Sequence, residues 1–364
     1  MAAKLRSWAP IVVPLIALVV VVLTYHRHIS AVVAILVGLV IIGAVLAAVH
    51  HAEVIAHRVG EPLGSIILAI AVTIIEVGLI ITLMLGGEGH STETLARDTA
   101  FAAVMITCNG IIGLSLLLAS FRHGLPRFNP EGAAAELGVI ATLAGLTLVV
   151  PTFTVGASGG RFTGVQLGFV AVAALVIYVA FITTQTVRNR DFFLPVASSG
   201  GPVKQDDHAT PPSNRTAIIS LVLLALSLFA VVELGHVVSP AIEDGLSAAG
   251  ISTTFVGVVI AFIVLLPEGI AAGRAALNNR LQTSLNLGYG SSIASIGLTI
   301  PAIAVASIWI HGPLVLGLDP LQITLLVLTL IVSTLTILPG RSTRLQGVLH
   351  LILLAAFVFL AINP

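Results

Sequence analysis

The chain carries very little charge for its length. Only 9% of its 364 residues are Asp, Glu, Lys or Arg, whereas 57% are hydrophobic and the mean hydropathy is +1.11. Soluble domains contain about 25% charged residues, so this composition excludes an ordinary soluble domain. The net charge is zero, so no overall field favours nucleic acid as a partner. The sequence therefore predicts an all-α polytopic protein of the lipid bilayer.

Cysteine is almost absent as well. The single cysteine, Cys108, excludes an intramolecular disulfide and a cysteine-based metal cluster. The chain also lacks the G-x-S-x-G, H-E-x-x-H and G-x-x-x-x-G-K-[ST] patterns of hydrolases, zinc proteases and ATP-binding sites. We therefore expect neither an enzyme nor an ATP-driven pump, and no bound cofactor.

Long apolar runs, separated by short polar breaks, fill most of the sequence. A helix of about 20 apolar residues crosses the hydrocarbon core of a bilayer. The first run lacks an A-x-A cleavage site and is expected to be a retained span rather than a signal peptide. The eleven predicted spans are 8–25, 30–49, 63–86, 98–120, 133–155, 163–186, 216–238, 250–273, 284–309, 321–338 and 345–362.

The few basic residues are distributed unevenly between the two sides of these spans. If successive spans alternate in direction, thirteen Lys and Arg residues fall on the side of the N-terminus, and only Arg27, Arg97 and Arg161 fall on the other. Positive residues concentrate in cytoplasmic loops. We therefore expect a prokaryotic plasma-membrane protein with a cytoplasmic N-terminus and an external C-terminus.

One long polar stretch, 188–215, divides the remaining spans evenly. It contains two Pro-rich turns and is expected to be a cytoplasmic linker. It follows an N-terminal helix in 1–29 and a five-helix set in 30–187, and it precedes a second five-helix set in 216–364. Because five is odd, the second set is inverted relative to the first. Inverted repeats of this kind are typical of secondary transporters.

Two nine-residue segments favour this division. Residues 107–115 and 284–292 share a hydroxyl residue, Asn, Gly and a second hydroxyl residue at identical offsets. Each lies in the third span of its five-helix set. We interpret them as equivalent parts of the two repeats.

Two glutamates lie inside runs that are long enough to cross the bilayer. Glu76 lies within 63–86, and Glu268 follows Pro267 within 250–273. Acids at the membrane centre are costly and commonly mark an ion or proton path. We interpret both as ligands of a cation that accept protons when it leaves, the alternative being neutral structural acids. Pro267 is expected to break or kink its helix and to free carbonyl oxygens beside Glu268.

Neutral oxygen atoms would complete the coordination shell of such a cation. Asn109 and Asn286 offer amide carbonyls, and Ser291 offers a hydroxyl. Four more hydroxyls come from Thr107, Ser284, Ser292 and Ser295. For the serines the alternative is close helix packing, because Gly and Ser are ordinary interface residues in membranes.

Two further polar groups have weaker functional interpretations. Glu233 and His236 are either an outer proton relay or an interfacial acid with its neighbour. The group formed by His50, His51, His57 and Glu53 matches no closed ligand set and is expected to form a solvated loop.

The sequence around the two acids resembles a known family. Gly60-Glu-Pro with Thr73-Ile-Ile-Glu76, and Leu266-Pro-Glu268 followed by 279–301, are similar to the two α-repeats of the calcium/cation antiporter superfamily, especially its bacterial ChaA-type members. The resemblance implies one acid per repeat, Glu76 and Glu268, that exchanges a cation for protons. It implies secondary contacts from Asn109 and Ser291. The G-N-x-x-E form of related calcium exchangers is absent, so the resemblance does not imply which ion is carried.

These observations together predict a secondary cation/proton antiporter that works by alternating access. Two carboxylates balance one Ca²⁺, which makes Ca²⁺/H⁺ exchange the first expectation. A monovalent ion with one retained proton also balances the charge, so Na⁺(K⁺)/H⁺ exchange is the alternative. A passive cation channel and a non-transporting membrane scaffold are the rivals from other classes.

Overall fold

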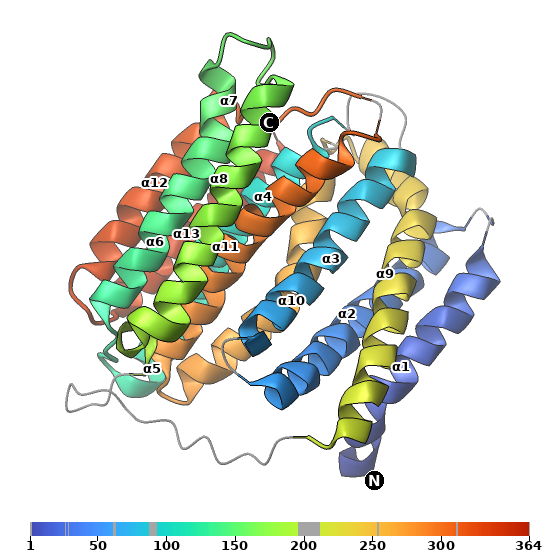
Figure 1. The fold of residues 1–364 in the computed structure, drawn as a ribbon, viewed down its shortest axis with the longest axis horizontal. Helices are drawn as coiled ribbons and strands as arrows, with labels where there is room; N and C mark the ends of the chain where they lie inside the picture. Colours follow the sequence, from blue (N-terminus) through green and yellow to red (C-terminus); the bar gives the residue numbers. More distant parts are fainter. Residues whose placement is uncertain are drawn as a thin grey trace. The chain divides into compact units, whose positions relative to one another are not determined.

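The computed structural model describes residues 2–25, 27, 29–60, 63–86, 93–195, 212–252, 255–310 and 312–363. These ranges are almost entirely helical, and the one β-contact within them is an isolated bridge between Arg127 and Arg341. Nine of the described helices are long and apolar enough to cross a membrane, and shorter apolar helices cover Trp8–Thr24 and Ala69–Leu85. The predicted polytopic helical fold with eleven spans is confirmed (Figure 1).

The helices group into two compact units. Unit 1 consists of Met1–Leu95 and His208–Val256, and unit 2 consists of Ala96–Asp207 and Gly257–Pro364. Each unit therefore combines helices from both sides of the predicted linker. The centre of that linker, 196–211, lies outside the described residues, as do Glu61 and Pro62.

Unit 1 contains four long helices. They are α1 (Ala2–Thr24), α2 (Ala31–Val59), α3 (Leu63–Gly86) and α9 (Asn214–Ala248). Helix α2 packs against the other three, and α9 also contacts α1 and α3 (Figure 1).

Glycines bring α3 and α9 close together. A Cβ atom on Gly78 would lie 2.6 Å from Val232 Cγ2, and one on Gly235 would lie 2.5 Å from Leu79 Cδ2. Small residues at such contacts allow helix backbones to approach closely within a membrane. Helix α3, which carries Glu76, is therefore held tightly against α9.

Two helices of unit 1 are longer than predicted. The second span was expected to end at 49, but α2 continues to Val59, and α9 continues past 238 to Ala248. The predicted solvated loop at His50, His51 and His57 is therefore wrong, because all three residues lie on α2.

The polar residues near the end of α2 are accommodated by tertiary contacts. His51 is 3% exposed, and its Nε2 donates to the Pro10 carbonyl at 2.9 Å. Its Nδ1 forms a hydrogen bond with the Ser220 hydroxyl at 3.2 Å. This histidine joins α1, α2 and α9. A helix whose buried polar groups find such partners can continue through a polar stretch.

Unit 2 contains the remaining helices. They are α4 (Leu95–Met105), η1 (Ile106–Ile111), α5 (Ile112–His123), α6 (Pro130–Ala144), η2 (Gly145–Val149), α7 (Val150–Phe153), α8 (Gly164–Thr183), η3 (Thr184–Arg188), η4 (Arg190–Phe193), α10 (Phe255–Leu277), α11 (Leu281–Ala306), α12 (Pro320–Ile337) and α13 (Arg344–Ile362). Helix α11 packs against α5, α6 and α8, while α12 contacts α6 and α13.

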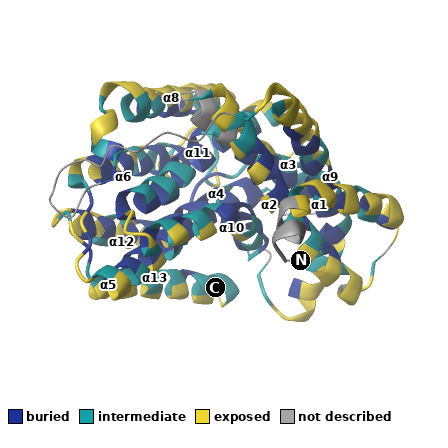
Figure 2. Ribbon diagram, turned by 90° about the horizontal axis from the view of Figure 1, so that it is seen from below, coloured by how far each residue is buried: buried dark blue, intermediate teal, exposed yellow. Residues whose placement is uncertain are grey.

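The outer helices of unit 2 expose apolar side chains. On α8 they recur at helical spacing, and Figure 2 shows exposed positions along this helix. The most exposed are Val165, Phe169, Val172, Val176 and Val179. A soluble protein rarely exposes such a continuous apolar stripe, whereas lipid tails solvate it.

Irregular backbone occurs beside Asn109 rather than beside Glu268. Helix α10 runs without interruption through Pro267, so of the two predicted outcomes, a break or a kink, the break does not occur. Proline removes one backbone donor, but neighbouring helices allow a membrane helix to tolerate this loss. The described π-helical segments are η1, η2 and η3, and η1 contains Asn109. Single π-turns inside α-helices are frequently found at functional sites.

Candidate functional site

Glu76 lies in the middle of the apolar helix α3 in unit 1. Its side chain is 1% exposed, and Ile75 and Ile80 beside it are buried as well. Ile70 and Ile74, on another face of the helix, are exposed. The carboxyl therefore points into protein rather than toward lipid, as expected for a functional acid within a membrane.

Glu268 lies on α10 in unit 2 and is partly buried. Pro267 immediately before it has no N–H group, so the carbonyl four residues earlier lacks its usual helical donor. A Cβ atom on Gly269 would lie 3.7 Å from Ile111 Cδ1, and one on Gly273 would lie 3.8 Å from Leu118 Cδ1. The helix face next to Glu268 thus packs on η1 and α5.

Asn109 is fully buried in η1 and has partners for both ends of its amide. Its Nδ2 donates to Thr329 Oγ1 at 2.9 Å, and its Oδ1 accepts from His350 Nδ1 at 3.1 Å. His350 Nε2 then accepts from Thr336 Oγ1 at 3.1 Å. The network joins η1, α12 and α13 and fixes the orientation of the amide.

Asn286, the predicted equivalent of Asn109, makes different contacts. Its Oδ1 accepts from Gln282 Nε2 at 2.8 Å, and its Nδ2 donates to the Phe193 carbonyl at 2.7 Å. The first bond lies within α11, and the second ties α11 to η4, the short helix that follows η3. The structure therefore does not place the two asparagines in one hydrogen-bonded cluster.

The two matched segments nevertheless meet. Ser284 Oγ donates to Ser115 Oγ at 2.6 Å and lies 2.9 Å from the Ala272 carbonyl. Farther along, a Cβ atom on Gly288 would lie 2.7 Å from Ile112 Cδ1. The numbering rises along α11 while it falls along α5, so the segments cross in antiparallel directions. A two-fold relation between inverted repeats produces contacts of this kind.

The hydroxyl residues predicted around the site differ in their surroundings. Thr107 donates to the Ala103 carbonyl one turn earlier at 2.8 Å, which is a common way to satisfy a buried threonine. Ser292 and Ser295 are buried on α11, and Ser291 is half-buried. Of the predicted site residues, Glu76 belongs to unit 1, whereas Glu268, Asn109, Asn286 and Ser291 belong to unit 2.

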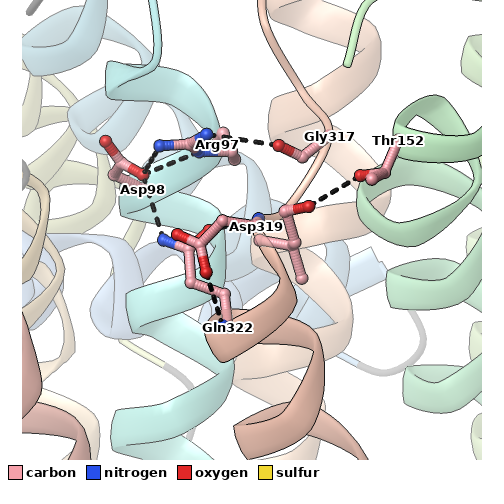
Figure 3. Close-up of polar contacts among 7 residues, drawn as sticks. Arg97, Asp98, Thr152, Gly317, Asp319 and Gln322 are labelled. Carbon is pink, nitrogen blue, oxygen red and sulfur yellow. Dashed lines mark hydrogen bonds and ion pairs between the residues drawn. The ribbon is translucent and has the colours of Figure 1, made fainter. Parts of the chain in front are cut away.

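A charged network at the start of α4 holds a neighbouring loop. Arg97 Nη2 and Asp98 Oδ1 are 2.8 Å apart, and Arg97 Nη1 donates to the Gly317 carbonyl at 3.2 Å (Figure 3). Gln322 Nε2 reaches Asp98 Oδ1 at 3.4 Å, and Asp319 caps α12 by accepting from the Gln322 N–H at 2.8 Å. Arg97 and Asp98 are thus paired within the fold, and their bonds to Gly317 and Gln322 fix the loop before α12.

Glu233 and His236 border a cavity of about 280 Å³ in unit 1. Its lining also includes Thr24, Tyr25, Arg27 and Asp244. Within the described ranges, no three His, Cys, Asp or Glu side chains are grouped so that they could hold a metal. The cavity therefore offers mixed charges rather than a ligand cluster.

One buried acid escaped the sequence interpretation. Glu136, within the predicted span 133–155, is fully buried on α6. The intramembrane position that identifies Glu76 also identifies this residue, so the signal was present in the sequence.

Comparison with known proteins identifies the family. The model of the family described as sodium/calcium exchanger protein matches residues 29–187 and 219–363. The chain belongs to this family and thus to the calcium/cation antiporter superfamily.

Two relatives match almost from end to end. The putative ionic transporter y4hA of Sinorhizobium fredii is 43% identical, covering 99% of this chain and 96% of the relative. The sodium-potassium/proton antiporter ChaA of Escherichia coli is 32% identical, covering 96% of this chain and 94% of the relative. Among solved structures, native YfkE superposes with a TM-score of 0.74 over 98% of this chain and 100% of that one. At 16% identity, this likeness shows the exchanger fold alone.

Proposed function

We propose that the protein is a secondary-active cation/proton antiporter. The observation that carries this proposal is Glu76, a carboxyl buried in an apolar membrane helix of an exchanger-family chain. Its E. coli relative is named a sodium-potassium/proton antiporter, and a more distant relative from Aphanothece halophytica is named a Ca²⁺/H⁺ antiporter. Both names describe exchange of an inorganic cation for protons.

In this proposal Glu76 and Glu268 bind the cation and carry the protons. Carboxylate oxygen is a preferred ligand of hard cations, and the same oxygen accepts a proton when the cation leaves. Asn109, Asn286 and Ser291 are the proposed secondary contacts. Each asparagine carbonyl already accepts one hydrogen bond, but an amide oxygen has a second lone pair for a cation.

Ca²⁺ is the first candidate for the transported ion. Two carboxylates neutralise one divalent charge, and the antiporter YfkE, named for Ca²⁺/H⁺ exchange, shares the fold. Na⁺ or K⁺ is the second candidate, supported by the ChaA relative at 32% identity. Ion competition under identical gradients separates the two.

We further propose that the protein resides in a prokaryotic plasma membrane with a cytoplasmic N-terminus, a cytoplasmic linker at 188–215 and an external C-terminus. The excess of Lys and Arg on one side of the alternating spans supports this orientation. Reporter fusions at the linker and at Pro364 should report opposite sides. Fusions that report the same side would contradict the inverted-repeat arrangement of the two five-helix sets.

Transport in everted membrane vesicles tests the main proposal. After a pH gradient is established, addition of Ca²⁺, Na⁺ or K⁺ should dissipate it, and cation uptake should run against its own gradient. If none of the three ions dissipates the gradient, the antiporter proposal is refuted. Large single-channel currents without uphill uptake would instead favour a passive channel.

Substitution of the two acids tests the assigned roles. Glu76→Gln and Glu268→Gln keep the side-chain shape but remove ionisation, so each should abolish proton-coupled exchange. Glu131→Gln, at an exposed position on α6, is the matched control and should leave exchange intact. Normal exchange by either test variant at equal membrane abundance would assign that carboxyl a structural role.

A further inference from the structure

Glu136 is an acid without a partner inside unit 2. It is 0% exposed, and within the described part of the chain neither of its carboxyl oxygens has a hydrogen-bond partner. Its helix face is otherwise apolar or small, with Ala133 and Ile140 buried one turn away on either side. A buried carboxylate without a counter-charge is costly, whereas a protonated carboxyl is tolerated far better.

The two helices α11 and α12, which pack against α6, also carry buried hydroxyl groups. Tyr289 of α11 is fully buried on a helix that packs against α6, and Glu136 contributes to the electrostatic environment of its hydroxyl. Within the part of the chain that the structure describes, neither the Tyr289 hydroxyl nor the Ser333 hydroxyl of α12 has a hydrogen-bond partner. Helix α6 packs directly on both α11 and α12, so three packed helices each carry a buried side-chain oxygen that has no hydrogen-bond partner among the described residues.

Few other titratable groups face α6. The elements packed against it are α8, α11, α12, η2 and η4. Besides Tyr289, α8 contributes the buried Tyr178, while Arg190 and Asp191 of η4 are exposed. Helices η2 and α12 contribute no titratable side chain. A proton is therefore the simplest ligand for the Glu136 oxygens.

A polar stripe on α12 leads away from this region. Thr329, Ser333 and Thr336 recur at helical spacing, and all three are buried. Thr336 contacts His350 Nε2 and, through its carbonyl, Gln346 near the start of α13. Hydroxyl and imidazole groups both donate and accept hydrogen bonds, so this stripe is polar within an otherwise apolar helix.

We propose that Glu136 is a further proton-binding carboxyl of this transporter, which gives up its proton when the transported cation enters and regains it when the cation leaves. The inference rests on the proposed antiport function. In the step, the O–H bond of the carboxyl breaks, its electron pair stays on the carboxylate, and water accepts the proton. Because Glu76 and Glu268 alone neutralise a divalent cation, the proton released by Glu136 adds to the protons that those two glutamates exchange, and the coupling ratio measures this addition.

The test is the coupling ratio of the purified protein in liposomes. The cation gradient at which net flux is zero is measured against the imposed pH gradient, and the slope gives protons exchanged per cation. Glu136→Gln removes one titrating group, so its slope should fall by one proton relative to the unsubstituted protein. Glu131→Gln, five residues earlier on the same helix but exposed, should retain the original slope. An unchanged slope in Glu136→Gln overturns the inference.

Infrared spectroscopy provides a readout that does not require transport. The C=O stretch of a protonated buried carboxyl should weaken when cation is added, and the weakened component should be missing from Glu136→Gln. A Glu136 band that is insensitive to cation makes the acid structural and refutes the inference. If Glu136→Gln does not accumulate, Tyr289→Phe replaces it and should shift the frequency of the same C=O band. A band that neither shifts in Tyr289→Phe nor responds to the cation also refutes the inference. Absence of proton-coupled exchange in the unsubstituted protein would refute the antiport proposal itself.

Discussion

The substitution Thr329→Val should loosen the π-helical segment that contains Asn109. Valine keeps the shape of threonine but removes the oxygen that accepts from Asn109 Nδ2 at 2.9 Å. The buried amide is left with Met105 Sδ at 3.9 Å, which is a weak acceptor. Hydrogen bonds between membrane helices contribute about 0.6 kcal/mol on average and about 1.7 at most. We expect the segment to be destabilised by an amount in this range.

Cys108 allows the change to be measured. It is the one cysteine of the chain, it is fully buried, and it immediately precedes Asn109. When reclosing is faster than labelling, the rate of thiol modification follows the population of the open segment. A loss of about 0.6 to 1.7 kcal/mol raises that population roughly 3- to 18-fold. Maleimide labelling of Cys108 in Thr329→Val should accelerate by this factor.

A matched control lies on the same helix. Thr334 is exposed, and its hydroxyl donates only to the Leu330 carbonyl one turn earlier. Thr334→Val should therefore leave the labelling rate unchanged. Equal rates in Thr329→Val and Thr334→Val would refute the argument that the Thr329 hydroxyl restrains η1.

Three further outcomes follow from the structure. Asp98→Ala should lower the free energy of unfolding in detergent by about 3 kcal/mol, because Arg97 loses its buried partner. An unchanged melting temperature would contradict the role of this pair. Gly288→Ala should destabilise by about 1–3 kcal/mol through its clash with Ile112, whereas Gly290→Ala, which has open space, should not; equal melting of the two would refute the packing argument. Because protons and the cation compete for carboxylate oxygens, the cation concentration that gives half-maximal transport should rise as pH falls. A half-maximal concentration that does not change with pH would contradict this competition.

Hydropathy predicted the helices because every membrane span must satisfy its own backbone hydrogen bonds. It failed at helix ends, where tertiary contacts decide how far a helix continues. The extension of α2 depends on His51, whose partners Pro10 and Ser220 lie on helices remote in sequence. No local sequence pattern predicts those contacts, so the sequence places the end of the second span at 49, directly before the first polar residues.

The buried acids were within reach of sequence analysis, but their partners were not. Glu76 was identified because a carboxyl interrupts an apolar run, and the same criterion applies to Glu136. The network around Asn109 was not predictable, because its partners Thr329 and His350 lie 220 and 241 residues away. Only the folded arrangement of η1, α12 and α13 shows that the amide orientation is fixed.

The contrast between Asn109 and Asn286 limits how far one repeat can be used to interpret the other. Both asparagines occupy the same offset in segments that share four residue types. Asn109 nevertheless lies in a buried network with a histidine, whereas Asn286 anchors α11 to the short helix η4. The serines Ser115 and Ser284, at opposite ends of the two segments, contact each other directly. A two-fold relation preserves the contact between the two repeats. It does not determine which other helices each asparagine contacts. The coordination of a cation by the two asparagines must therefore be tested separately for each residue.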